Sequence, residues 1–297
     1  MAKTRDIVVG LVIVTAVLMF FMIVIISILG ISRQGGFSIT SLGDKIAVVE
    51  VNGVIERSED IVRQLKKYGN DNSVRAIVLR INSPGGVVAP TQEIYNQILK
   101  VREDGKYVVV SMSSVTASGG YYIACAGDSI LANPGTLTGS IGVMLSFLNF
   151  EGLMDKVGVE MEVVKSNEMK DVGNYSREMT QKEREMLQAA IDDTYDQFVI
   201  TVSEARNMDI DQVEEIADGS IYTGSQALDL GLIDKLGGLE DAITMAGQMA
   251  GLGDNPRIIR EYPRRRRLFD YLVEKVAEML GLGMVKQAWP RLEYIYK

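Results

Sequence analysis

The sequence of 297 residues contains no histidine, and this absence excludes several kinds of active site at once. A serine protease with a histidine base is excluded, because the serine hydroxyl would have no imidazole to take its proton. A zinc site with histidine ligands and an HExxH metalloprotease are excluded as well. Any activated serine in this chain must therefore use a carboxylate or a lysine as its base.

Cysteine is nearly absent too, since Cys125 is the single one. It has no partner for a disulfide within the chain, so we expect it to be a buried, structural residue. The formal net charge of −8 argues against a general nucleic-acid binder. The charge is uneven, however: residues 254–297 carry ten Lys or Arg against six Asp or Glu, a net of +4, which leaves −12 for the rest.

Charge is missing altogether from residues 7–31, where only Thr15 and Ser27 are clearly polar. As a helix rising about 1.5 Å per residue, this run would span roughly 37 Å, enough for a tilted crossing of a ~30 Å hydrocarbon core. It is too long for the apolar part of a cleaved signal peptide, and no A-x-A-like cleavage site follows it. We therefore expect a transmembrane anchor at residues 1–31, followed by a linker at 32–43.

The flanking charges predict how this anchor is oriented. Lys3, Arg5 and the amino terminus precede the run against a single Asp6, and only Arg33 follows it closely. Because positively charged flanks stay in the cytoplasm, we expect a cytoplasmic N-terminus. The chain would then be a single-pass protein of the cell membrane, with its catalytic domain outside the cytoplasm.

Beyond the linker, strand-like and helix-like segments alternate, which predicts an α/β fold with a mostly parallel sheet and helical crossovers. Residues 45–55, 75–82 and 107–112 are β-branched and apolar, as buried strands are. The capping-box pattern Thr180-Gln-Lys-Glu183 predicts the start of a long helix that reaches about Arg206. The other expected strands cover residues 129–131 and 159–165, and the other expected helices cover residues 58–68, 89–101, 224–230 and 239–251.

Two glycine-rich turns each follow a buried strand, where the reactive groups of parallel sheets gather. The first is Asn82-Ser-Pro-Gly-Gly86, whose glycines let the backbone approach a ligand closely. The second, Ser118-Gly-Gly120, places a hydroxyl at the expected start of a helix, where free N–H groups favour an oxyanion. The two turns are either a nucleophile with its oxyanion hole, or ordinary glycine turns in which Ser118 caps the helix.

Four strings occur in a set order: SPGG at 83–86, TASGGYYIA at 116–124, TGSIGV at 138–143 and KDVGNYSREM at 170–179. In this order and spacing they resemble the signal peptide peptidase A family, membrane-anchored serine–lysine proteases of the Clp protease/crotonase superfold. The resemblance covers roughly residues 44–250, and it implies a protease domain of that fold at 44–253. It also implies peptide substrates such as signal-peptide remnants, a homo-oligomeric ring, and no cofactor or metal.

The resemblance also assigns roles to single residues: Ser118 as nucleophile, Lys170 as base, Ser140 as the hydroxyl that orients the lysine amine, and Gly85 and Gly119 as oxyanion donors. Gly86 is the alternative to Gly85. A free lysine has a pKa of about 10.4, so only about one in 10³ to 10⁴ is neutral at pH 7. A lysine base therefore needs surroundings that disfavour its charged form.

Two other functions stay open at this point. A crotonase-like acyl-CoA enzyme shares the superfold and its oxyanion hole, although the expected anchor places the domain away from cytoplasmic coenzyme A. A catalytically silent membrane scaffold would have no need of the intact set of Ser118, Ser140 and Lys170.

The last segment, residues 254–297, is expected to be a basic amphipathic tail. Arg264 to Arg267 precede an apolar stripe at helical spacing that begins at Leu268. Such a helix can lie on an anionic membrane or pack on the protease domain or a neighbouring subunit, and we favour packing. Residues 290–297 are extended and rich in aromatics, which leads to the hypothesis that they reach the substrate groove as a self-ligand.

Overall fold

The computed structural model describes residue 19, residues 43–261 and residues 292–295. The chain divides into two units, Met1–Gly43 and Asp44–Lys297. The expected anchor at 7–31, apart from Met19, and the expected amphipathic helix of the tail lie outside the described residues. Within the described part, no helix combines the length and the apolar character needed to cross a bilayer.

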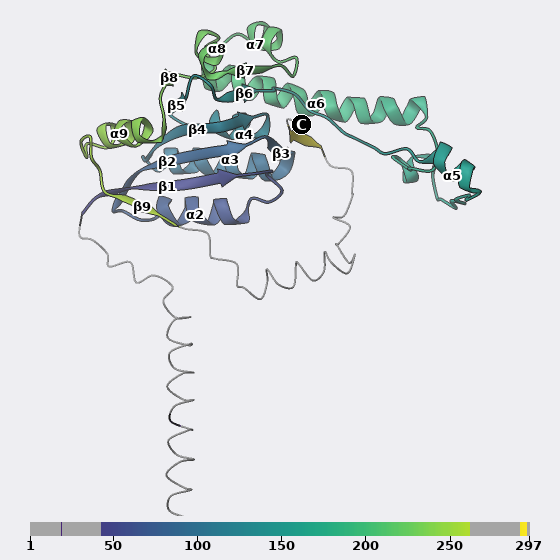
Figure 1. The fold of residues 1–297 in the computed structure, drawn as a ribbon, viewed down its shortest axis with the longest axis horizontal. Helices are drawn as coiled ribbons and strands as arrows, with labels where there is room; N and C mark the ends of the chain where they lie inside the picture. The colour runs from purple at the N-terminus through teal and green to yellow at the C-terminus, as the bar shows by residue number, and fades with distance from the viewer. Residues whose placement is uncertain (1–18, 20–42, 262–291, 296–297) are drawn as a thin grey trace, which may run out of the picture. The chain divides into compact units, whose positions relative to one another are not determined.

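A mostly parallel sheet forms the centre of the second unit (Figure 1). In the described residues it has eight strands, in the order β7-β6-β4-β2-β1-β9, with β5 paired to β4 and β8 to β5. The pairing is parallel except between β6 and β7. The strands are β1 (Lys45–Asn52), β2 (Val74–Ser83), β4 (Tyr107–Ala117), β5 (Ser129–Ala132), β6 (Leu137–Gly139), β7 (Ile221–Thr223), β8 (Lys235–Leu236) and β9 (Ile258–Arg260).

Helices connect and cover these strands, as the alternating sequence pattern predicts. They are α2 (Glu59–Gly69), α3 (Val88–Glu103), α4 (Gly119–Ala124), α5 (Glu151–Val157), the 3₁₀ helix η1 (Glu168–Asp171), α6 (Gln181–Arg206), α7 (Ile210–Ile216), α8 (Gly224–Asp229) and α9 (Leu239–Met249). A separate two-stranded antiparallel sheet is formed by β3 (Gly85–Val87) and β10 (Glu293–Ile295).

Both faces of the central sheet are buried, which explains why its strands read as continuous apolar runs. Successive side chains of a strand point to opposite faces. In β1, Ala47 and Val49 belong to one core cluster, to which α2, α3 and α4 contribute. Ile46 and Val48 belong to the other, which α9 covers with residues such as Ile243.

After β6 the chain leaves this core and forms a projection, residues 145–190, which we call the arm (Figure 1). The arm contains α5, η1 and the first turns of α6. The expected capping box is present at Thr180 and Glu183, and α6 ends at Arg206 as predicted. The strand expected at 159–165 is wrong, because these residues lie in the arm without a strand to pair with, and Val164 is 94% exposed.

Candidate active site

Ser118 lies between the end of β4 and the start of α4. Its φ of 52° is left-handed, a conformation that costs energy for any residue with a Cβ. Its side chain is buried, at 1% exposure, and its Oγ has no hydrogen-bond partner among the described residues. The hydroxyl therefore does not cap α4, contrary to the ordinary-turn interpretation. A buried, unpartnered hydroxyl in a strained turn is typical of a reactive group.

Ser140 lies beside Ser118 because β6 pairs with the end of β4, where Ala117 is opposite Gly139. The Ser118 N–H donates to the Gly139 carbonyl at 2.8 Å. Ser140 is also left-handed, with φ of 50°. In the described part of the chain, only one other non-glycine residue, Asn207, has a positive φ. Backbone strain is thus concentrated at the two serines, as it often is at functional sites.

The SPGG turn approaches the same place from the neighbouring strand β2. Gly85 has φ of +101°, and a Cβ added there would lie 2.8 Å from the Gly119 nitrogen, so only glycine fits. The Gly85 N–H donates to Ser83 Oγ at 3.1 Å. The amide that the sequence favoured as an oxyanion donor is therefore already engaged, which directs attention to Gly86.

Strand β10 lies across this site as an extended segment. It pairs antiparallel with β3, with Tyr294 opposite Gly86 and Ile295 opposite Gly85. On its other side, Glu293 exchanges two backbone hydrogen bonds with Met144, of 3.1 and 3.2 Å. The addition of a strand is a common way in which proteins bind extended peptides. The space between β3 and Met144 is therefore a groove that accepts a peptide backbone.

The carbonyl oxygen of Tyr294 lies close to the glycines of both turns. A Cβ added to Gly85 would be 2.0 Å from this oxygen, and one added to Gly119 would be 3.1 Å from it. The glycines thus leave the space that the Tyr294 carbonyl occupies next to both turns.

The pairing of β3 and β10 also indicates which amide faces this oxygen. The Val88 N–H donates to the Leu292 carbonyl at 3.1 Å. Hydrogen-bonded pairs of antiparallel strands recur at every second residue, so the next such pair is Gly86 with Tyr294. The Gly86 N–H is therefore directed toward the Tyr294 carbonyl.

The side chain of Tyr294 fills a pocket between α4 and α6. It is fully buried, and its hydroxyl donates to the Thr194 carbonyl at 3.1 Å. Its ring stacks on Tyr122 at 5.3 Å between centroids and packs on Phe198 at 4.8 Å. Burial raises the pKa of Tyr294 well above its usual value, so the phenol is neutral. The pocket suits a large aromatic or apolar side chain.

A cavity of about 370 Å³ lies beside the last described residue of β10. Its lining includes Ser140, Met144, Tyr195, Asp218 and Ile295. The groove therefore has room for side chains on both sides of the Tyr294 carbonyl.

Lys170 is the one predicted site residue that the fold of a single chain does not bring to Ser118. It is an exposed residue of η1, in the arm, and Figure 1 shows the arm extending away from α4 and β3. Its ammonium makes no hydrogen bond or ion pair with the described residues, and the Ser118 hydroxyl has none either. The residues that one chain does bring together are Ser118, Ser140, Gly85 and Gly119.

Comparison with known proteins decides the family of this chain. The sequence profile described as Peptidase family S49 matches residues 100–253, and the one described as Clp protease matches residues 41–138. The chain belongs to peptidase family S49. The resemblance to the signal peptide peptidase A family, noted from four sequence strings, is thereby confirmed.

Relatives of this S49 peptidase carry protease names. It is 44% identical over 250 residues to a protein of Synechocystis sp. named as a protease, covering 82% of this chain and 90% of that one. It is 36% identical over 253 residues to a protein of Enterococcus faecium named as signal peptide peptidase SppA, covering 80% and 73%. It is 37% identical over 215 residues to Protease 4 of Haemophilus influenzae, covering 69% and 35%. The chain is a serine protease with a mixed α/β, Clp protease-like domain.

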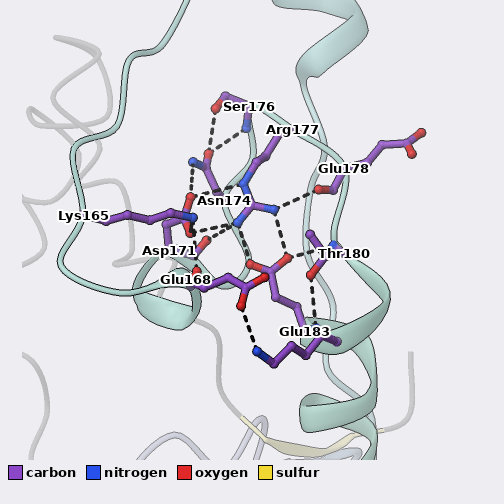
Figure 2. A network of polar contacts seen from close by, with 10 residues as sticks. Lys165, Glu168, Asp171, Asn174, Ser176, Arg177, Glu178, Thr180 and Glu183 are labelled. Carbon is purple, nitrogen blue, oxygen red and sulfur yellow. Dashed lines mark hydrogen bonds and ion pairs between the residues drawn. The ribbon is translucent and has the colours of Figure 1, made fainter.

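Sequence reasoning missed two parts of this S49 peptidase. One is the aromatic pocket, because Tyr122, Phe198 and Tyr294 are far apart in the sequence and meet only in the fold. The other is the ion pair between Arg177 and Glu183 (Figure 2). A signal for it was present, since an arginine lies just ahead of the capping box that ends in Glu183.

Proposed function

We propose that this S49 peptidase is an endopeptidase in which Ser118 is the nucleophile and Lys170 of the partner subunit is the base. The observation that carries the proposal is the buried, unpartnered Ser118 Oγ beside a groove that accepts an extended peptide. Within the described part of one chain the Ser118 hydroxyl has no base as a hydrogen-bond partner, and a serine without a base is a poor nucleophile. Lys170, in the arm, is not brought to the Ser118 of its own chain, whose proton it could take. A second copy of the chain, with its arm laid against this groove, supplies what each lacks.

The arm itself supports assembly with further copies. Of the sixteen large apolar side chains exposed in the described residues, nine belong to the arm: Leu148, Phe150, Leu153, Val157, Val159, Met161, Val164, Tyr175 and Met186. A gathering of exposed apolar side chains marks an interaction surface. Contact between the arm of one chain and the groove of the next is head-to-tail, and such contacts close into rings.

The chemistry follows from these placements. The neutral amine of Lys170 takes the proton of the Ser118 hydroxyl while Oγ forms a bond to the peptide carbonyl carbon. Ser140, next to Ser118, accepts a hydrogen bond from the amine and orients it. When the carbon–nitrogen bond breaks, the lysine ammonium gives its proton to the departing amine. The same lysine then takes a proton from a water that attacks the acyl carbon, and it returns this proton to Ser118 Oγ as the bond from Oγ to the acyl carbon breaks.

The oxyanion formed in both steps needs two donors that already point at it. The Gly119 N–H and the Gly86 N–H are the best placed, because the Tyr294 carbonyl lies beside both residues. A preorganised donor of this kind is worth roughly 3–4 kcal/mol of transition-state stabilisation. Gly85 contributes by leaving room for the carbonyl, since its own N–H is bonded to Ser83.

The substrates fit the same picture. The groove binds backbone on both edges and places one side chain between Tyr122 and Phe198, so it accepts unfolded, apolar peptides. Signal-peptide remnants have this character. The uncharged run at 7–31 would be a single-pass anchor with a cytoplasmic N-terminus. It would hold the protease domain at the extracytoplasmic surface of the cell membrane, where such peptides are released.

A mixing experiment on the purified full-length chain tests the proposal. Ser118→Ala and Lys170→Ala are each expected to abolish cleavage of a fluorogenic peptide while circular dichroism stays unchanged. Equal amounts of the two inactive chains, unfolded and refolded together, are expected to recover about a quarter of the wild-type activity. In a head-to-tail ring about one contact in four pairs an intact Ser118 with an intact Lys170.

Each outcome has a clear reading. Full activity of either single variant would refute the assignment of that residue. Inactive single variants whose mixture stays inactive would show that serine and lysine act within one chain. Turnover of an acyl-CoA thioester in preference to peptides would instead favour a crotonase-like enzyme.

A further inference from the structure

The arm has no hydrophobic core of its own. Among residues 145–190 the only buried side chain is that of Glu183, which is a carboxylate at 1% exposure. No buried apolar side chain therefore fixes the turn that carries Lys170, and the packing beside it, of Phe147 on Gly173 and of Phe150 on Tyr175, is between partly exposed residues. A base must be held to within a fraction of an ångström, because a misplacement of about 1 Å can cost 10²-fold in rate. Some other interaction has to hold η1 in place.

Arg177 makes the connection that packing does not provide (Figure 2). One edge of its guanidinium donates to Asp171, with Nε 3.2 Å from Oδ2 and Nη2 2.9 Å from Oδ1. The other edge donates to Glu183, with Nη1 2.9 Å from Oε2 and Nη2 2.5 Å from Oε1. The Glu178 carbonyl accepts a further bond at 3.0 Å. All five N–H groups thus have acceptors, an arrangement that fixes the geometry on both sides.

Arg177, Lys165 and Lys182 together hold both ends of η1. Asp171, its last residue, is bound by Arg177 and also by Lys165. Glu168, its first residue, is bound by Lys182 at 2.8 Å, and its carbonyl accepts the Lys165 ammonium at 3.1 Å. Lys170 lies between these two fixed positions, and its own side chain has no polar partner in the part of the chain that the structure describes.

The contacts of Arg177 with Glu183 connect the turn of Lys170 to helix α6. Glu183 closes the capping box of α6, because its carboxylate also accepts the Thr180 N–H at 2.8 Å. Helix α6 continues from there into the core, where Phe198 is buried. Arg177 therefore ties the turn of Lys170, through Glu183, to a helix that is itself fixed to the sheet.

The same residues set the charge around Lys170. The charged groups of η1 and of the segments packed against it are three cations, Lys165, Arg177 and Lys182, and three anions, Glu168, Asp171 and Glu183. A neighbouring carboxylate favours the charged form of an amine, which is the wrong form for a base. Hydrogen bonds from Arg177, and next from Lys165, hold the pKa of Asp171 well below its usual value and compensate its charge.

We propose that Arg177 is a positioning residue for the catalytic lysine. It ties η1 to the start of α6, and it compensates the carboxylates of Asp171 and Glu183. This inference rests on the proposed function, in which Lys170 is the base. Arg177 touches neither the groove nor Ser118, so it acts only through the turn that it holds.

Three variants of the full-length chain, with one control, test this inference by their kcat, KM and pH profiles on a peptide substrate. Arg177→Lys keeps the charge but loses the bidentate geometry, so we expect kcat to fall about 10-fold with an unchanged profile. Arg177→Met loses both, so kcat should fall about 10²-fold. The acid limb of its profile should move up by about half a pH unit, because Asp171 loses its main counter-ion. KM should stay within about twofold for all, because the side-chain contacts of Arg177 are with Asp171, Glu178 and Glu183 and not with the residues that bind β10.

The remaining variants separate this effect from a loss of folding. Arg177→Met leaves Glu183 buried without a cation, so Arg177→Met with Glu183→Gln is made as well, and the same fall in kcat is expected. The control is Arg184→Met. Arg184 is an exposed arginine next to Glu183 in the first turn of α6, and its substitution should leave kcat, KM and the pH profile unchanged. Wild-type kcat and an unmoved acid limb in both Arg177→Met chains would overturn the inference.

Different results would contradict the proposed function and the inference about Arg177. If Lys170→Ala kept its activity, the lysine would not be the base, and the proposed function would fall whatever Arg177 does. If Lys170→Ala is inactive while the Arg177 variants match the wild type, the proposed function stands and this inference falls.

Discussion

At the scale of single residues, Glu183 has the clearest dependence on pH. Its hydrogen bonds from Arg177, and secondly from the Thr180 backbone, lower its pKa from an ordinary 4.5 to about 2. Because the folded-state pKa is depressed, the stabilisation is complete above about pH 4.5 and is lost as the pH falls toward 2. We expect the protection of residues 168–190 against hydrogen exchange, taken relative to the intrinsic rate at each pH, to fall within this range, before the central sheet unfolds.

A matched variant checks the assignment to this carboxyl group. Glu183→Gln has no carboxyl to protonate, so the protection of its residues 168–190 should be lower at neutral pH and should change less between pH 4.5 and 2. An equally steep change in the variant would mean that another acid, such as Asp171, controls the arm.

Some of the candidate site residues could be predicted from the sequence, and others could not. The order of the motifs located Ser118 and Ser140, and the structure brings these two together with strained backbones. The sequence could not separate Gly85 from Gly86, and the hydrogen bond from the Gly85 N–H to Ser83 Oγ, which favours Gly86 as the proposed donor, is visible only in the fold. Whether Lys170 is the base stays a prediction.

At the scale of elements, strand β10 is expected to compete with substrate. It fills the groove with backbone hydrogen bonds on both sides and buries Tyr294. A chain that stops after residue 291 should therefore have a KM about 10-fold lower than the full chain, because a tethered ligand competes at a high effective concentration. Titration of a fluorogenic peptide measures the difference.

The side chain of Tyr294, in β10, gives a matched variant for this test. Tyr294→Gly keeps the length of the chain but leaves the aromatic pocket empty, so its KM should also fall. Unchanged turnover in the shortened chain would remove the self-ligand hypothesis.

The success of prediction for elements follows from how local their signals are. Helix α6 was predicted because its capping box and its periodic pattern lie within the helix itself. Residues 290–297 were expected to be extended, and β10 lies among them, but its pairing with β3 was not predicted, because each strand has three residues and its partner is about 200 positions away. Residues 159–165 have the composition of a strand, but composition cannot supply a neighbour.

At the scale of the whole molecule, we expect activity to depend on assembly through the exposed apolar side chains of the arm. Leu153 and Val164 are 59% and 94% exposed, so an aspartate at both positions should be tolerated by the fold of one chain. It should disfavour contact with a second chain, because the charges would have to be desolvated. We expect smaller assemblies by light scattering and at least about a 10-fold loss of kcat/KM.

The control for this double variant lies outside the arm. Ile210 in α7 is 48% exposed, and Ile210→Asp should change neither size nor activity. A monomeric but fully active double variant would contradict an active site shared between chains.

The architecture of the whole was predictable where it repeats. Buried strands such as residues 45–52 alternate with amphipathic helices along the sequence. This alternation is enough to predict a parallel sheet that is covered on both faces. The arm was not predictable, because it has no hydrophobic periodicity and its one buried side chain is the charged Glu183.

The stacking of Tyr294 on Tyr122 gives this protein a built-in optical signal. Coupled aromatic rings about 5 Å apart in a rigid, asymmetric setting produce near-ultraviolet circular dichroism, and the ring pairs Tyr95–Tyr122 and Phe198–Tyr294 add to it. A peptide that displaces the tail changes this spectrum whether or not it is cut. Binding to the groove can therefore be followed without a label, even in a chain whose Ser118 has been replaced.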